Sequence, residues 1–332
     1  MTFRVTLFTR QDCSLCDTAK EDLKALQSEI PHELVIVDVD RQADLKAKYG
    51  ARVPVLETGS YVLEPPFDRQ KLRATLGAAR DRAQRLAEDL TPQQAKRRAR
   101  ANVLSRGDRI SWWISNRWLL SLNLVVFLYV GLPFLAPVLM NAGLPGLARP
   151  IYGVYSFTCH QLAFRSWFLF GEQPAYPRAA ANVDGLATFG EVSGLNEDDL
   201  LAARGFIGNE QVGYKVGYCQ RDVAIYAAML AFGLIYAATK KRIPALPWWL
   251  WILIGMGPIG IDGFSQLLSQ IPGWPFWVYR ESTPFLRTLT GAIFGFTTAW
   301  FGFPVVGETM AETRLMLATK IARLTGSVSD PK

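Results

Sequence analysis

Long apolar stretches without charge occupy the second part of the chain, whereas residues 1–110 mix charged and apolar positions. A helix needs about 17–25 predominantly apolar residues to cross the hydrocarbon core of a bilayer. Four stretches meet this requirement, namely residues 118–140, 222–239, 247–268 and 285–306. The pattern predicts an α-helical transmembrane domain of about four spans, preceded by a soluble amino-terminal domain.

Short alternating and helical patterns follow one another in the first eighty residues. They predict strands at 3–8 and 34–39, helices at 17–27 and 43–49, a hairpin of 53–57 with 61–63, and a helix at 68–76 that ends near Gly77. The expected order is strand, helix, strand, helix, hairpin, helix. The first strand pattern begins at Phe3, so no cleavable signal peptide is expected.

Residues 81–117 form a charged, basic linker in front of the first span. The region 80–117 holds ten Arg and Lys residues against four acids. A basic run beside a span is typical of the cytoplasmic side and contacts anionic lipid, so the net charge of +7 indicates a membrane partner and not nucleic acid. Trp112, Trp113 and Trp118 stand where an aromatic belt is expected.

Charge also predicts the orientation of the membrane domain, residues 118–307. The linker, Lys240–Arg242 and the tail at 308–332 are basic, whereas the loop 172–221 has seven acids against four bases. With four spans the basic segments share one side, so both termini are predicted to be cytoplasmic. Within the tail, Leu317, Ile321 and Leu324 form one stripe, which predicts an amphipathic surface helix.

The segment Ile151–Phe170 is apolar, yet a fifth crossing would place the charged loops on the wrong sides. It is interpreted as a helix that lies in the outer interface or enters the membrane and returns.

Cys13-Ser14-Leu15-Cys16 is the clearest chemical motif of the chain. Two thiols with two residues between them can close a small, reversible disulfide if a helix begins at Cys13. The free backbone N–H groups at such a helix start also favour the thiolate of Cys13.

This motif after the first strand, with Val-Asp-Val-Asp at 37–40 and Tyr-Gly-x-x-Val-Pro-Val-Leu at 49–56, resembles the glutaredoxin/thioredoxin family over residues 1 to about 80. The resemblance implies an α/β thioredoxin-like fold with Pro54 in the cis form. It also implies that Cys13 attacks and Cys16 resolves, that no cofactor is required, and that a thiol client, a reductant protein or glutathione is the partner.

The motif departs from ordinary glutaredoxins, because Ser14-Leu15 replaces Pro-Tyr and Asp12 adds a negative charge. An unreactive dithiol and a metal-binding pair therefore remain alternatives. Zinc would need two further ligands, which residues 1–80 do not visibly provide.

Clusters of polar residues interrupt the membrane half, and with four spans they are all expected at the outer end or in the outer third of their segments. They are Cys159-His160-Gln161 with Arg165, Cys219-Gln220-Arg221-Asp222, Asp262 with Gln266, Arg287, and Thr290-Gly291. Asp262 and Gln266 are four residues apart and share a helix face, and a carboxylate within a span calls for a partner, for which Arg287 is the candidate. Gly291 and Gly295 predict close packing of the last span against a neighbour.

These motifs over about 120–305 resemble a family of predicted bacterial and archaeal membrane proteins without an assigned chemistry. The resemblance implies a multi-pass protein of the cell membrane of a prokaryote.

Three functions fit the sequence. The first is a membrane-anchored thiol–disulfide oxidoreductase, in which a quinone or a haem would have to relay electrons between the dithiol and Cys159/Cys219, and a haem with two histidine ligands is excluded because the membrane half contains His160 alone. The second is a ligand-binding or transport module that uses Arg165, Arg221, Arg287 and Asp262, with a redox-sensing dithiol domain. The third is a metal-dependent enzyme that holds Zn²⁺ with Cys159, His160, Cys219 and Asp222 or Asp262. A purely structural role, with Cys159 and Cys219 as a disulfide staple, is the alternative to all three.

Overall fold

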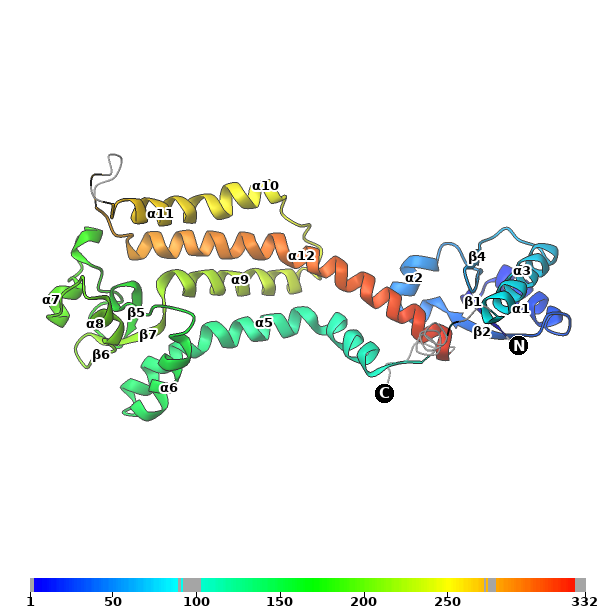
Figure 1. The fold of residues 1–332 in the computed structure, drawn as a ribbon, viewed down its shortest axis with the longest axis horizontal. Coiled ribbons are helices and arrows are strands. Elements are labelled where there is room, and N and C mark those ends of the chain that lie inside the picture. The colour runs from blue at the N-terminus through cyan, green and yellow to red at the C-terminus, as the bar shows by residue number, and fades with distance from the viewer. Residues whose placement is uncertain (1–2, 89–90, 92–102, 272, 274–278, 326–332) are drawn as a thin grey trace. The chain divides into compact units, whose positions relative to one another are not determined.

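The computed structural model describes residues 3–88, 91, 103–271, 273 and 279–325, and Figure 1 shows its elements. The chain divides into two compact units. Unit 1 comprises residues 1–118 and 308–332, and unit 2 comprises residues 119–307. Lys96, Arg97, Arg98 and Arg100 of the basic linker, and the helix expected from Gln93, lie outside the described residues.

Unit 1 is built on a four-stranded sheet in the order β2-β1-β3-β4. Its strands and first helices are β1 (Phe3–Thr9), α1 (Ser14–Leu26), β2 (His32–Asp38), α2 (Ala43–Tyr49), β3 (Val55–Thr58), β4 (Tyr61–Leu63) and α3 (Arg69–Glu88). β1 and β2 are parallel, whereas β3 is antiparallel to both β1 and β4. This arrangement confirms the thioredoxin-like fold and the predicted order of elements.

The last helix of the α/β part is longer than predicted. α3 continues through Gly77 to Glu88, because Leu72, Leu76 and Ala79 are buried against the sheet and keep the helix regular beyond the glycine. A single glycine within a helix costs only about 1 kcal/mol, which such packing offsets.

The ends of two long helices pack on the α/β part within unit 1. α5 (Arg106–Asn141) supplies Trp112, and α12 (Pro284–Thr325) supplies Leu317, Ala318, Ile321 and Ala322, to a core shared with Phe8 and Tyr49. The prediction of an amphipathic surface helix at 313–324 is therefore wrong. Its apolar stripe is buried by protein and not by lipid. Trp112 likewise belongs to this core and not to an exposed aromatic belt.

Ion pairs surround this packed region of unit 1. Lys320 Nζ lies 2.8 Å from Asp108 Oδ2, and Arg314 Nε lies 3.4 Å from Asp44 Oδ2. Arg323 pairs with Glu57, which also accepts a hydrogen bond from Tyr49 at 2.8 Å. Arg314 and Arg323 of the α12 end thus bind the α/β part directly, whereas Lys320 binds the start of α5.

Unit 2 contains residues 119–141 of α5, residues 284–307 of α12 and six further helices among the described residues. These six are α6 (Pro145–Tyr155), α7 (Phe189–Ser193), α8 (Leu200–Gly205), α9 (Gln220–Ala238), α10 (Trp248–Leu250) and α11 (Gly257–Leu268). A π-helical stretch at Trp251–Met256 joins α10 to α11. Among the described residues, four helical segments are long and apolar enough to span a membrane, at 106–141, 220–238, 248–268 and 284–324. The predicted four spans are confirmed.

The segment between α6 and α9, residues 156–219, contains a small sheet and shares a core with α5 and α6 within unit 2. A three-stranded antiparallel sheet, β5 (Ser166–Leu169), β7 (Gly213–Cys219) and β6 (Gly208–Asn209), packs with aromatic side chains such as Phe164, Phe168 and Phe189. The predicted helix over 151–170 is therefore wrong. α6 ends at Tyr155, and strand pairing with β7 holds residues 166–169 extended.

Small residues let α12 approach α9 closely, as predicted. A Cβ atom on Gly295 would lie 2.1 Å from the carbonyl oxygen of Ile225, and one on Gly291 would lie 2.7 Å from that of Arg221. Such contacts admit glycine alone without a shift of the helices. They place the first two turns of α9 against residues 291–295 of α12.

We expect Ile321→Ala to destabilise unit 1 by about 2–4 kcal/mol, because Ile321 is 2 % exposed in the shared core. Native-state hydrogen exchange of the full chain in detergent should show faster exchange in β1 and β2. Met316→Ala, at a position 67 % exposed on the same helix, is the control and should leave exchange unchanged. Equal exchange in both variants would contradict the packing role.

Candidate functional site

The thiols of the first motif lie at the start of α1 and form a disulfide, Cys13–Cys16. Cys13 is the N-cap residue, and its sulfur accepts a hydrogen bond from the backbone N–H of Cys16 at 3.2 Å. Cys16 is fully buried, whereas Cys13 is half-buried. Of the two sulfurs, Cys13 is the one that another molecule can reach.

The surroundings of the dithiol are open and partly apolar. Leu15 is 63 % exposed, and Ser14 is exposed beside it. The peptide bond between Val53 and Pro54 is cis, as the resemblance implies. Asp12 adopts a positive φ of 56°, which turns the chain from β1 into the helix. An exposed apolar side chain next to an accessible sulfur suits contact with a protein client.

In unit 2 the first polar centre is Asp262 on α11, which is 3 % exposed. Its carboxylate pairs with Arg221, accepts a hydrogen bond from Arg280 Nη2 at 2.8 Å, and accepts another from Ser282 Oγ at 2.8 Å. Three donors thus compensate one buried charge.

Glu281 forms a second polar centre, and its side chain is 2 % exposed. It pairs with Arg287 and with Arg165, whose Nε lies 2.8 Å from Oε1, while Arg178 Nη1 lies 3.7 Å from Oε2. Arg287 also donates to Gln266 Oε1 at 3.2 Å. The prediction that Arg287 pairs with Asp262 is wrong, because Glu281 is the nearer carboxylate and Arg221 and Arg280 occupy Asp262.

Sequence reasoning missed Arg178, Arg280 and Glu281. Arg280 and Glu281 lie just before the last span in the sequence. Glu281 is only six residues before Arg287, so the sequence did contain a signal that these two opposite charges form a pair. Arg178 gave no such signal, since it lies in a long loop. Only the fold brings it to Glu281.

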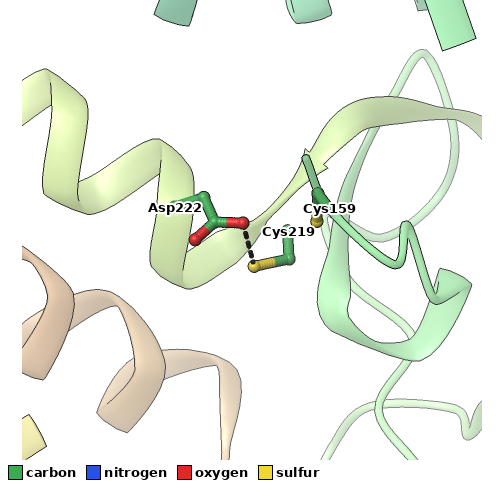
Figure 2. Close-up of side chains that lie close together, drawn as sticks. All are labelled: Cys159, Cys219 and Asp222. Atoms are coloured by element: carbon green, nitrogen blue, oxygen red, sulfur yellow. Dashed lines mark hydrogen bonds between the residues drawn. The ribbon is translucent and has the colours of Figure 1, made fainter. Parts of the chain in front are cut away.

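The two remaining cysteines meet near the start of α9. Figure 2 shows Cys159, Cys219 and Asp222 together, with the Cys219 thiol donating to Asp222 Oδ2 at 3.1 Å. Both cysteines are free, and the two sulfurs and a carboxylate oxygen of Asp222 all lie within 4.8 Å of one another. Neither His160, which is exposed, nor Asp262 belongs to this group. Of the residues expected to hold a metal, the structure gathers Cys159, Cys219 and Asp222 and leaves His160 and Asp262 outside this group.

The turn that carries Cys159 is held by Gln161, whose φ is +53°. Gln161 Nε2 donates to the carbonyl oxygens of Tyr152 at 2.9 Å and Gly217 at 3.0 Å. These bonds tie the Cys159 turn to α6 and to β7, the strand that ends at Cys219. The sequence marked Gln161 as a candidate residue of the membrane site, and in the structure its side-chain amide holds the Cys159 turn in place.

Lys215 is a buried cation beside this group, and it was also missed. Its Nζ donates to the carbonyl oxygens of Gln161 at 2.8 Å and Arg204 at 2.6 Å. Burial lowers the pKa of Lys215 to about 7, and the nearby Cys159 opposes this effect.

The two thiols are unequal. The neighbouring Cys219 thiol and the Gln161 N–H lower the pKa of Cys159, although burial opposes them. The neighbouring Cys159 and burial raise the pKa of Cys219.

Comparison with known proteins supports the division of the chain. Residues 4–77 match the family described as glutaredoxin-like domain (DUF836), and residues 206–301 match the family described as predicted membrane protein (DUF2085). The uncharacterized protein MJ1492 of Methanocaldococcus jannaschii is 28% identical over 162 residues, which are 48% of this chain and 69% of that protein. The X-ray structure of the structural genomics target protein XcR50 from X. campestris is 41% identical, covers 22% of this chain and 96% of its own, and gives a TM-score of 0.21.

The chain thus carries a glutaredoxin-like domain at its amino-terminal end, followed by a predicted membrane protein domain. Both recognitions made from the sequence motifs are confirmed.

We expect Asp262→Ala to destabilise unit 2 by about 3–5 kcal/mol, because Arg221 and Arg280 would lose their buried counter-charge. A lower temperature of unfolding in detergent would report this loss. Asp184→Asn, at an exposed acid of the 156–219 segment, is the control and should leave that temperature unchanged. An unchanged temperature for Asp262→Ala would show that the ion pairs contribute nothing to stability.

Proposed function

We propose that the protein is a membrane-anchored thiol–disulfide oxidoreductase whose reactive groups are Cys13 and Cys16. The observation that carries this proposal is the asymmetric disulfide at the start of α1, with one accessible sulfur and one fully buried sulfur. An accessible attacking thiol and a buried resolving thiol are what a two-step exchange requires. The match of residues 4–77 to a glutaredoxin-like domain supports the same chemistry.

The exchange proceeds in two steps from the reduced dithiol. The Cys13 thiolate attacks one sulfur of a client disulfide, forms a mixed disulfide and releases the other client sulfur as a thiolate. Cys16 then loses its proton and attacks Cys13 Sγ, which releases the second client thiolate and closes the Cys13–Cys16 disulfide. The client gains two electrons, and a thiol reductant such as glutathione restores the dithiol.

The first step is favoured by the position of Cys13 as N-cap of α1. Backbone N–H groups at a helix start stabilise a thiolate, and Cys13 Sγ already accepts one such N–H, from Cys16. The exposed Leu15 offers an apolar contact to a client on the accessible side.

We further propose that the dithiol faces the cytoplasm. Four spans return the chain to its starting side, and the packing of residues 317–322 with the α/β part agrees with both ends lying on one side. The basic linker and Lys240–Arg242 favour the cytoplasm for that side.

We expect Cys13→Ser to abolish reduction of a glutathione mixed disulfide by the purified full-length protein, because the attacking thiolate is absent. Cys16→Ser should instead accumulate a mixed disulfide on Cys13, which mass spectrometry detects. Cys159→Ser is the matched control and should retain full activity. Activity that survives Cys13→Ser would refute the proposal.

A second experiment tests the orientation, using reporters in a variant with all four native cysteines replaced by serine. Leu201→Cys, 80 % exposed in the 156–219 segment, should react with an impermeant maleimide in intact cells. Arg242→Cys, exposed after α9, should react only after the cells are permeabilised. The reverse labelling would place the dithiol outside.

A further inference from the structure

The group formed by Cys159, Cys219 and Asp222 in unit 2 has no part in the chemistry proposed for the dithiol of unit 1. We propose that these three side chains bind one Zn²⁺ ion, with two thiolates and one carboxylate oxygen as ligands and the fourth position open to water or to an external donor.

The donor atoms are already gathered within about 1 Å of the spacing of a zinc site. Zinc binds sulfur at about 2.3 Å and carboxylate oxygen at about 2.0–2.2 Å, so donors around a tetrahedral ion lie roughly 3.5–3.8 Å apart. In the protein the sulfurs and the oxygen lie within 4.8 Å of one another, and Cys219 Sγ is 3.1 Å from Asp222 Oδ2. Side-chain rotations alone can bring three such donors onto one ion.

The ligands come from elements that the fold fixes in place. Cys219 is the N-cap residue of α9 and Asp222 lies three residues further on, so both project from the first turn of one helix. Cys159 is held by a backbone hydrogen bond from its N–H to the Tyr155 carbonyl at 3.0 Å and by the Gln161 turn described above. A site whose supporting hydrogen bonds exist before the metal arrives loses little order on binding.

The chemical types of the donor atoms determine which metal ion the site prefers. Thiolates favour zinc and other soft or borderline ions over magnesium and calcium, which take oxygen ligands only. Three protein ligands with an open position are typical of zinc sites that bind a water molecule or a substrate. His160, the residue after Cys159, is exposed and lies outside the group, and within the part of the chain that the structure describes no other His, Cys, Asp or Glu joins the three ligands.

The net charge of the zinc-bound site is small. Binding releases the thiol protons, and Zn²⁺ with two thiolates and one carboxylate leaves a single net negative charge. Lys215, whose Nζ donates to the carbonyl oxygen of Gln161, stands next to the site, and its protonated form offsets this charge.

The test uses full-length protein with Cys13→Ser and Cys16→Ser, so that the first dithiol cannot bind metal, reduced and kept without oxygen in detergent. Titration with Co²⁺, which reports thiolate ligation by sulfur-to-cobalt charge-transfer absorption, should saturate at one ion per chain. Added Zn²⁺ should then abolish that absorption, because zinc displaces cobalt from a thiolate site.

In this background Cys159→Ser and Cys219→Ser should each reduce the charge-transfer absorption and weaken Co²⁺ binding at least about tenfold. Asp222→Asn should weaken binding by a similar factor while the sulfur absorption persists at saturation. Asp184→Asn is the control for a general loss of negative charge and should bind as the parent does. Elution on size exclusion and helical circular dichroism verify that each variant is folded.

Two results would overturn the proposal. One is a reduced, folded parent protein that shows no sulfur-to-cobalt absorption, or an absorption that Cys159→Ser leaves intact. The other is a Cys159–Cys219 disulfide, mapped by mass spectrometry, in protein isolated under the same reducing conditions. Either result leaves the dithiol chemistry of Cys13 and Cys16 untouched, since that is measured with a different substrate in a different unit.

Discussion

Two buried carboxylates, Asp262 and Glu281, organise the polar end of unit 2. Each is almost inaccessible to solvent and would be too costly to leave uncompensated beside an apolar helix bundle. Arg221 from α9 and Arg287 from α12 supply two of the counter-charges, and Arg165 from the 156–219 segment supplies another. The same contacts fix the first turn of α9, and with it the place where Cys219 and Asp222 project toward Cys159.

Unit 1 depends on a different constraint, the burial of apolar surface between helix ends and a small α/β domain. Leu317, Ile321 and Trp112 join the core around Phe8 and Tyr49, so the helix ends at 106–118 and 308–325 are part of the folded unit that carries the Cys13–Cys16 pair.

Much of the chain could be predicted because its signals are local. The strand and helix periods before Gly77, the Cys-x-x-Cys motif and the four apolar runs each depend on neighbours within about twenty residues. The wrong predictions of secondary structure share one cause, because local patterns alone do not show what a segment packs against. Packing or strand pairing with distant segments decided the structure at three places, namely the helix end expected at Gly77, the helix expected at 151–170 and the surface helix expected at 313–324.

The sequence by itself determined the class of each half, the four apolar spans and the position of the Cys13–Cys16 motif at a helix start, because composition and short spacing are enough for those. Only the tertiary structure decided which charges pair. It assigned Glu281 to Arg287 and gave Arg221 and Arg280 to Asp262. It also placed Cys159 beside Cys219 across sixty residues and left His160 outside their group. Contacts between residues far apart in the chain arise from the folding of the whole unit, and no local pattern of residues encodes them.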